Sequence, residues 1–262
     1  MQKRHLDPLQ YINEQIFTTQ KYIIPFIRQV KNVDASVQVL EIGCGEAGNL
    51  KPFLDLGCLC TGVDFSVQKI EKGKEYYATH PFAKNIRLIS EDIYKTTEFH
   101  AQFDIIIIRD VIEHIHDQDK FLSMLKELMA IDAVVFFAFP PWQNPFGGHQ
   151  QICENKLLST LPYFHLLPIP IYRAVLKLFG ENEGKIAALL EIKETGISLE
   201  CFERIVSKNG YVRLKRILYL INPNYEVKFG LKPRKLGSIF EKIPYFRDYI
   251  TTCGYYLISK TE

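Results

Sequence analysis

Residues 39–48 read V-L-E-I-G-C-G-E-A-G, a short apolar strand that runs directly into a glycine-rich turn. Gly43, Gly45 and Gly48 fit the pattern G-x-G-x-x-G. In that pattern the first glycine permits a tight turn, the second lets the backbone approach a ligand, and the third lets the following helix pack closely on the strand. The stretch therefore predicts a nucleotide-binding turn in an α/β sheet.

A second predicted strand, residues 58–63, is apolar and ends at Asp64. A carboxylate at this place can accept hydrogen bonds from both hydroxyls of a ribose. The glycines and Asp64 together fit either a nicotinamide dehydrogenase or a methyltransferase. Glu41 distinguishes these classes, because a carboxylate just before the turn would repel a pyrophosphate but would tolerate an ammonium or sulfonium group. S-adenosylmethionine carries both of these cations.

Strands and helices alternate along most of the chain, which predicts a doubly wound, Rossmann-like α/β fold. We expect a sheet of seven strands in which the final strand runs antiparallel. Ser66 is the expected N-cap of the helix at residues 67–77. The expected strands are residues 37–42, 58–63, 86–89, 103–108, 133–139, 210–220 and 254–260, and the other expected helices are residues 47–56, 118–129 and 198–209.

The same pattern divides the chain into four parts. Residues 1–36 form a helical N-terminal cover over the cofactor entrance, and residues 37–140 form the cofactor-binding core. Residues 141–196, rich in prolines and aromatic residues, form an inserted lid over the acceptor. Residues 197–262 complete the sheet and contain a basic insertion.

Four stretches resemble, in order, the class I S-adenosylmethionine-dependent methyltransferases, especially the group of ubiquinone-biosynthesis-like and small-molecule or sugar methyltransferases. They are V-L-E-I-G-C-G-E-A-G-N-L at residues 39–50, T-G-V-D-F-S at 61–66, I-S-E-D-I at 89–93 and F-D-I-I-I-I-R-D-V-I-E-H-I at 103–115. The resemblance implies S-adenosyl-L-methionine as cofactor and S-adenosyl-L-homocysteine as product.

The resemblance also implies roles for individual residues. Glu41 and the backbone around the glycine turn face the methionine end of the cofactor, Asp64 binds the ribose, and Asp92 with the Ile93 backbone meets the adenine. Arg109 and Asp110 border the pocket. The complete set of implied cofactor-binding residues is Glu41, Gly43, Cys44, Gly45, Asp64, Phe65, Asp92, Ile93, Arg109 and Asp110.

Transfer of a sulfonium methyl group is an in-line displacement, so a general base is needed only where the acceptor still carries its proton. The candidate catalytic residues are Glu113 and His114, close to the end of the fourth strand, and His149 in the loop after the fifth. A capping box made by Asp110 and Glu113 is the structural alternative. A divalent metal held by this cluster is a further alternative, but we assign no metal ligands. Trp142 either pins the lid to the core or stacks on the acceptor.

The amino-acid composition indicates which broad class of protein this chain belongs to. The chain has 262 residues, 47% of them hydrophobic and 24% charged, as in an ordinary soluble globular protein. Its apolar runs fall short of the roughly 20 residues needed to cross a bilayer, and its first ten residues lack a secretory signal. The six cysteines form no C-x-x-C pair, which indicates reduced thiols and no structural zinc site. We therefore expect a cytoplasmic protein.

Charge and amphipathicity bear on partners. The formal net charge of +2 makes nucleic acid an unlikely partner. Residues 204–247 are nevertheless rich in basic side chains, which predicts a solvated face or, alternatively, attraction of an acidic acceptor. Residues 169–179 show helical amphipathicity with Arg173 and Lys177 among apolar side chains. A lid core explains this pattern, and peripheral contact with a membrane surface is the alternative.

The leading hypothesis is a methyltransferase that acts, by preference at oxygen, on a small molecule or on a glycan or lipid-linked acceptor. A nucleic-acid methyltransferase that uses the basic C-terminal region is the first alternative. A nicotinamide-dependent oxidoreductase is less favoured because of Glu41 and the I-S-E-D-I stretch. A module that binds the cofactor without catalysis is the remaining alternative.

Overall fold

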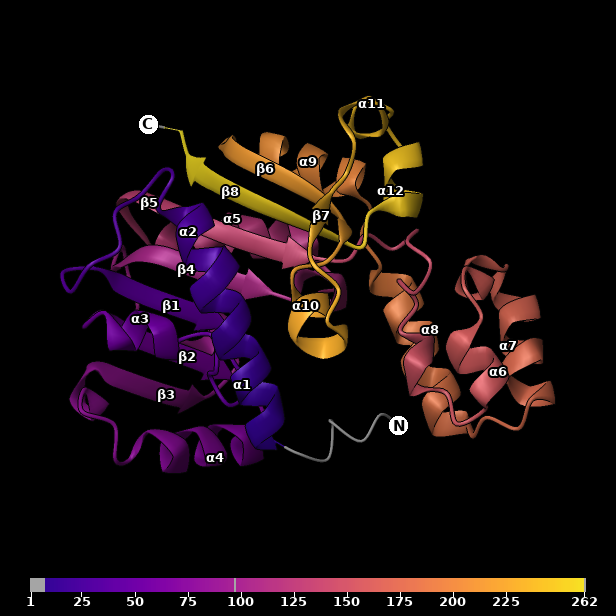
Figure 1. Ribbon diagram of the computed structural model, residues 1–262, viewed down its shortest axis with the longest axis horizontal. Coiled ribbons are helices and arrows are strands. Elements are labelled where there is room, and N and C mark those ends of the chain that lie inside the picture. The colour runs from indigo at the N-terminus through magenta and orange to yellow at the C-terminus, as the bar shows by residue number, and fades with distance from the viewer. Residues whose placement is uncertain (1–7, 97, 262) are drawn as a thin grey trace.

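The computed structural model describes residues 8–96 and 98–261. These residues form one sheet in the strand order β3-β2-β1-β4-β5-β8-β6-β7 (Figure 1). Strands β1 to β5 are parallel, whereas β8 is antiparallel to both of its neighbours, β5 and β6. The strands are β1 (Gln38–Ile42), β2 (Leu59–Asp64), β3 (Ile86–Ser90), β4 (Phe103–Arg109), β5 (Met129–Phe139), β6 (Tyr211–Ile221), β7 (Arg234–Lys235) and β8 (Cys253–Lys260).

The doubly wound, Rossmann-like fold is confirmed, and all seven expected strands are present. The expected count is wrong by one strand, because β7 within the basic insertion pairs antiparallel with the end of β6. The α-helices are α1 (Pro8–Thr18), α2 (Ile24–Ile27), α3 (Lys51–Asp55), α4 (Val67–Tyr77), α5 (Gln118–Leu128), α6 (Lys156–Thr160), α7 (Ile169–Leu178), α8 (Glu183–Thr195), α9 (Leu199–Lys208), α10 (Asn224–Phe229), α11 (Ser238–Glu241) and α12 (Phe246–Ile250).

Strand β4 shows why the sheet is buried on both faces. Ile105 and Ile107 point into one hydrophobic core, which α2, α3 and α4 cover. Ile106 and Ile108 point into the other core, which α5 and α9 cover. A continuous run of β-branched residues is therefore required at this central parallel strand.

The helix expected at residues 47–56 is shorter than predicted, because α3 spans only Lys51–Asp55. Ala47 has a φ of +63°, which is incompatible with an α-helix. Gly48 packs against α1 instead, because a Cβ on it would lie 2.9 Å from the backbone oxygen of Ile12. The third glycine of the motif thus serves the N-terminal helix. The expected N-cap is confirmed, since the Ser66 hydroxyl accepts a hydrogen bond from the amide of Lys69.

Helix α1 lies across the sheet near the carboxyl ends of β1, β2 and β3, whereas α2 lies over β5 and β8, where Phe26 contacts Phe136 and Tyr255 (Figure 1). Helices α1 and α2 are joined by a π-helical segment, Thr19–Ile23, and Pro25 lies in the first turn of α2. Proline is tolerated there because the first amides of a helix have no partner within the helix. The predicted helices are therefore present as a nearly continuous helical stretch, and their role as a cover over the cofactor entrance remains a prediction.

Helices α6, α7 and α8 project beyond the carboxyl ends of the strands (Figure 1) and share a hydrophobic core of their own. Tyr172 and Leu176 of α7 are buried in this core, whereas Ile169, Ile171 and Leu178 are exposed. We keep the name lid for residues 141–196 after their predicted role. Helix α7 packs one apolar face into the core of this segment and presents other apolar side chains to solvent. None of the helices in residues 8–96 and 98–261 has the length and apolarity to span a membrane.

The two ends of the lid meet at Trp142, and we call this place the neck. The amide of Trp142 donates a hydrogen bond to the carbonyl oxygen of Ile197 at 2.8 Å. Gly196 lies against the indole, since a Cβ on it would be 2.5 Å from the ring. His165 contacts the same ring edge-on and hydrogen-bonds through Nε2 to the Trp142 carbonyl. These contacts favour the structural interpretation of Trp142.

Ion pairs occupy much of the predicted basic region. The Glu203 carboxylate pairs with Arg213, Arg216 and Arg247. Arg216 also pairs with Glu241. Arg247 pairs in addition with Glu200. Three carboxylates within the fold are thus paired with three of the arginines in residues 204–247, which gives these three a structural role.

Candidate active site

The glycine turn is held between β1 and the end of β2. The amides of Gly43 and Cys44 both donate hydrogen bonds to the Val63 carbonyl, at 2.8 and 3.2 Å. Gly43 has a φ of +71°, and a Cβ on it would collide with Val111. Gly45 has a φ of +56°, but a Cβ there would meet only the Lys69 side chain at 3.6 Å. Gly45 is buried, but no backbone atom lies within 4 Å of that Cβ position, so the turn leaves room for a ligand to approach there.

Asp64 connects the end of β2 to this turn. One carboxylate oxygen accepts a hydrogen bond from the Gly45 amide at 2.9 Å, and the other accepts one from the Ser66 amide at 2.8 Å. The Asp64 residue is only 8% exposed, whereas the neighbouring Phe65 is 85% exposed. Each carboxylate oxygen can accept further hydrogen bonds. The geometry thus orients Asp64 beside the turn with acceptor capacity left for a ligand's hydroxyls.

A buried polar network lies beneath the turn and is centred on Asn49. The Asn49 amide nitrogen donates to a Glu41 carboxylate oxygen at 2.6 Å. Its carbonyl oxygen accepts from Arg109 at 2.7 Å and from the Thr19 hydroxyl at 2.8 Å. The network joins the turn, β1, β4 and the N-terminal helices. Our sequence analysis overlooked Asn49, although an amide between a glycine turn and an apolar helix is a recognisable signal for a buried polar contact.

Glu41 retains an unused acceptor. Burial raises the pKa of its carboxyl group to about 8, against the opposing effects of the Asn49 hydrogen bond and the Arg109 charge. Its second carboxylate oxygen is buried and has no hydrogen-bond partner among the described residues. Such an orphaned acceptor fits a cationic ligand, because a cation would favour the ionised carboxylate. This observation agrees with an ammonium-bearing cofactor at the turn.

Cys44 has a packing role within the same turn. Cys44 is buried, and its sulfur packs against Gly62. A Cβ added to Gly62 would lie only 2.8 Å from this sulfur. Burial raises the thiol pKa well above its ordinary value, and nearby Glu41 acts in the same direction. A nucleophilic role requires a thiolate, so Cys44 serves to fill the space below the turn.

The end of β3 adjoins the end of β2, which places the predicted adenine contacts at the same edge. The amide of Glu91 donates to the Asp64 carbonyl at 3.1 Å. Asp92 is exposed and caps the short helix Ile93–Lys95 through a hydrogen bond from the Tyr94 amide. The structure therefore brings Asp92 and Ile93 to the sheet edge that carries Asp64 and the glycine turn.

The end of β4 contradicts the predicted capping box. Asp110 has a φ of +53°, and its amide donates to the Ala138 carbonyl. The short 3₁₀-helix that follows, Ile112–His114, has Val111 at its N-cap position and no side-chain cap. Asp110 instead lies 3.6 Å from the Arg109 guanidinium. The Glu113 side chain is buried, and its carboxylate does not cap this helix.

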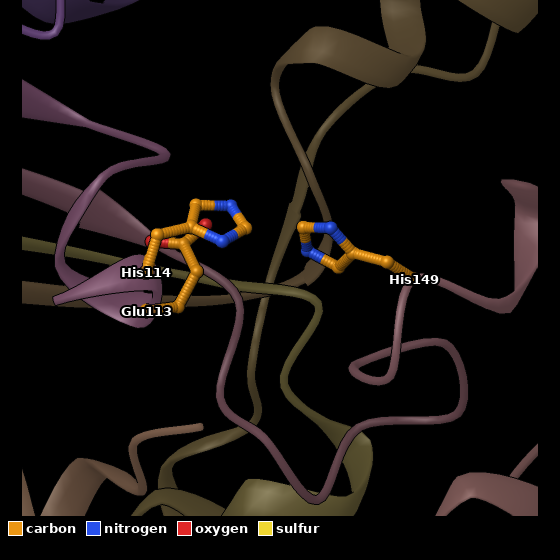
Figure 2. A group of neighbouring side chains, drawn as sticks. All are labelled: Glu113, His114 and His149. Carbon is orange, nitrogen blue, oxygen red and sulfur yellow. The ribbon is translucent and has the colours of Figure 1, made fainter. Parts of the chain in front are cut away.

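Glu113, His114 and His149 converge at this place (Figure 2). One side-chain ligand atom of each residue lies within 4.8 Å of those of the other two. The two imidazole rings meet edge-to-face, with their centroids 5.1 Å apart. Glu113 and His114 come from the turn after β4, whereas His149 comes from the loop after β5 and has a left-handed backbone with a φ of +53°.

Burial controls the protonation of this cluster. It raises the pKa of Glu113 well above its ordinary value, and the charge of Asp110 adds to the effect. It lowers the pKa of His149 to about 4, with a contribution from His114, and it lowers the pKa of His114 as well. Both imidazoles are therefore neutral at physiological pH and have a nitrogen lone pair available.

The comparisons identify the family. A family model described as a methyltransferase domain matches residues 13–162. The chain belongs to this methyltransferase-domain family. It is 26% identical over 130 residues to a ubiquinone biosynthesis O-methyltransferase of Pelagibacter ubique, covering 50% of this chain and 51% of that protein. A protein of the same name from Rhodopseudomonas palustris is 30% identical over 115 residues, or 43% of this chain and 44% of that one. The chain spans about half the length of the curated relatives it matches.

Solved structures show the same fold over most of the chain. A geranyl diphosphate C-methyltransferase of Streptomyces coelicolor A3(2) has a TM-score of 0.56 and 14% identity, covering 91% of this chain and 80% of that one. A magnesium protoporphyrin IX methyltransferase of Synechocystis has a TM-score of 0.56 and 12% identity, covering 96% and 84%. Both were solved with S-adenosylhomocysteine. At these identities the likeness concerns the fold.

Together these findings confirm the family that the sequence motifs resemble, the class I methyltransferases with a Rossmann-like fold. The orphaned oxygen of Glu41 and the space beside Gly45 are compatible with S-adenosylmethionine as the ligand. The comparisons give no support to the nicotinamide oxidoreductase or to the nucleic-acid methyltransferase.

Proposed function

We propose that this protein transfers the methyl group of S-adenosylmethionine to a hydroxyl oxygen of a small molecule. The observation that carries this proposal is the convergence of Glu113, His114 and His149 at the carboxyl end of β4. In parallel α/β sheets ligands bind at this end of the strands. Neutral imidazoles are suited to accept a hydroxyl proton, whereas an acceptor without such a proton would not need them.

The proposed cofactor site uses the residues around the turn. Glu41 faces the ammonium group, the Gly45 backbone meets the methionine portion, and Asp64 accepts from the ribose hydroxyls. Asp92, the Ile93 backbone and exposed Phe65 lie at the adenine end. The bound cofactor supplies the electrophilic methyl group. The protein holds it at the edge of the sheet beside the cluster on the turn after β4.

The proposed acceptor site lies between that cluster and the lid. The loop of residues 142–151 carries His149, and the turn after β4 carries His114 and Glu113 (Figure 2). Gly148 packs directly against His165, because a Cβ on it would collide with that ring. The lid therefore holds the backbone beside His149 in place, and it positions this imidazole opposite His114.

Oxygen is favoured as the methylated atom by the curated relatives, which are named as O-methyltransferases. The fold does not specify the atom, because a solved neighbour is named as a C-methyltransferase. The proposed acceptors are hydroxylated aromatic compounds and sugars, either free or carried on a glycan or a lipid. Peripheral contact with a membrane would serve the lipid-carried class, and the exposed apolar side chains of α7 are compatible with it.

Transfer of isotope-labelled methyl from S-adenosylmethionine tests this function. The untagged protein is incubated with panels of catechols, phenols and sugars, and with matched amines and RNA as controls. Mass spectrometry then locates the label and measures release of S-adenosylhomocysteine. We expect methyl ethers from a hydroxylated acceptor. Labelled amines or RNA with unlabelled hydroxyl compounds would contradict the proposal.

A further inference from the structure

Glu113 is an unusual buried acid. It is only 4% exposed, and neither carboxylate oxygen has a hydrogen-bond partner among the described residues. Burying an unpaired carboxylate is costly, so such a group is normally paired with a cation or protonated. The nearby cation Arg109 is engaged with Asn49 and Asp110. Within residues 8–96 and 98–261 no cation is paired with the Glu113 carboxylate, which lies in the cluster with His114 and His149.

The neighbours of Glu113 are two imidazoles whose nitrogens can act as ligands. The ligand atoms of Glu113, His114 and His149 all lie within 4.8 Å of one another. Two atoms bound at about 2.1 Å to one ion are separated by at most about 4.2 Å. Small side-chain rotations are enough to bring the three atoms into a common coordination shell.

We infer that Glu113, His114 and His149 form a binding site for a divalent first-row transition-metal ion of the zinc or cobalt type. Two imidazole nitrogens with one carboxylate oxygen are a donor set that such ions prefer, whereas magnesium and calcium prefer oxygen donors throughout. Three protein ligands leave at least one position open. The inference concerns metal binding and does not depend on the identity of the methyl acceptor. With an ion bound, the lone pairs of both imidazoles would be engaged, so an acceptor hydroxyl would be activated by the ion and not by a free histidine.

The surroundings hold the ligands in place. The Thr195 hydroxyl donates to the Glu113 carbonyl at 2.7 Å, and Gln118 donates from its side chain to the carbonyls of Ile112 and Thr195. These contacts fix the turn that carries Glu113 and His114 against α8 of the lid. Such supporting hydrogen bonds orient metal ligands in known sites.

The site joins two parts of the chain. Glu113 and His114 belong to the core, whereas His149 belongs to the lid loop (Figure 2). A bound ion would therefore tie the lid to the carboxyl end of β4. An ion at this place also lies next to the proposed acceptor pocket, and only this last point rests on the proposed function.

Metal binding is measured directly on the full-length protein, produced without a histidine tag and stripped with a chelator. Calorimetry with Zn²⁺ and visible absorption with Co²⁺ report binding without any methyl acceptor. We expect one tightly bound ion per chain and a Co²⁺ spectrum typical of mixed nitrogen and oxygen ligands. Saturating metal should also slow proteolysis within residues 141–196.

Three variants make the test specific. His149→Ala and Glu113→Gln should each weaken Zn²⁺ binding by at least about tenfold, since each removes a ligand. Glu113→Gln keeps the side-chain shape, so it remains informative if His149→Ala folds poorly. The matched control is His100→Ala, because His100 is exposed and lies outside the cluster. Absence of Zn²⁺ binding by the wild-type protein, or equal binding by all variants, would overturn the inference, whether or not methyl transfer is observed.

Discussion

The side-chain amide of Asn49 donates a 2.6 Å hydrogen bond to the carboxylate of Glu41. Because Asn49 also accepts from Arg109 and Thr19, it fixes the position of the Glu41 carboxylate. The amide occupies only one Glu41 oxygen and leaves the other oriented but unpaired. The predicted cofactor site is thus prepared by the residue that directly follows the G-x-G-x-x-G pattern.

Asn49→Ala should weaken binding of S-adenosylmethionine by about 1.5–3 kcal/mol, the range for a lost hydrogen bond to a charged group. The reason is that Glu41 loses its orienting donor and Arg109 loses an acceptor. Isothermal titration calorimetry measures the change. Asn85→Ala serves as the control, because Asn85 donates only to the Gly57 carbonyl. Equal affinities of the two variants would show that the network does not position the cofactor.

Asp64→Ala should also cost about 1.5–3 kcal/mol of cofactor affinity, if Asp64 accepts from the ribose hydroxyls. Asp64→Asn retains one oxygen that can accept from the Gly45 amide. This variant therefore tests the contact with the ligand while the hydrogen bond that supports the turn is kept. Titration of S-adenosylmethionine and of its 2′-deoxy analogue measures the contact. An unchanged affinity in both Asp64 variants would exclude the ribose assignment.

Gly45→Val should abolish cofactor binding while leaving the fold largely intact. Gly45 has a positive φ and its missing side chain leaves room for a ligand. Gly237→Val is a matched control, since Gly237 has an ordinary φ of −63° and lies at the start of α11. Circular dichroism verifies folding, and calorimetry measures affinity. Normal binding by Gly45→Val would mean that the turn faces something other than the cofactor.

His149→Ala should lower the turnover number by about 10²–10⁴ on an identified acceptor, with cofactor affinity nearly unchanged. The same result is expected for His114→Ala. Steady-state kinetics with labelled cofactor and calorimetry provide the two readouts, and His100→Ala is the control. Full turnover in both variants would mean that the histidines only pack. Catalysis would then depend on the positioning of cofactor and acceptor.

Asp248 should make the protein less stable as the pH rises from about 4 to about 8. Burial and the neighbouring Glu200 raise the pKa of Asp248 to about 8 in the folded state, whereas an unfolded aspartate has a pKa of about 3.9. The folded protein therefore holds a proton that the unfolded chain releases, so this contribution is complete below pH 4 and is lost by pH 8.

Asp248→Asn should remove this dependence, because an amide keeps the acceptor for the Leu199 amide and a donor for Glu200 without titrating. Urea denaturation at pH 5 and pH 8 measures the free energy of unfolding. We expect the variant to gain stability relative to the wild type between these two values. A constant difference between the two proteins would rule out a raised Asp248 pKa.

Much of the fold follows from local patterns. Strand β4 could be predicted from its continuous apolar run, because a central parallel strand is buried on both faces. The N-cap role of Ser66 could be predicted because capping depends on neighbouring residues. The edge of the sheet at which the cofactor is predicted to bind could be identified from Glu41, the glycines and Asp64. The contacts of each of these residues with the ligand remain predictions.

Other features depend on tertiary contacts. The approach of the loop after β5 to the turn after β4 could be predicted, because both follow the carboxyl ends of neighbouring parallel strands. The edge-to-face contact between His114 and His149 could not, because it depends on how that loop folds back. The expected capping box was wrong because the left-handed backbone of Asp110 directs Glu113 inward. The predicted helix was too long at its start, because Ala47 has a left-handed backbone and Gly48 packs against α1.

The neck at Trp142 has a consequence for how this protein could diversify. Because the inserted segment departs and returns at neighbouring points, its internal length and sequence can drift without displacing the strand ends that bear the donor-binding groups. Related chains can in this way inherit a constant methyl-donor apparatus while exchanging the part that selects an acceptor. Sequence differences that change the substrate would then be concentrated in this inserted segment.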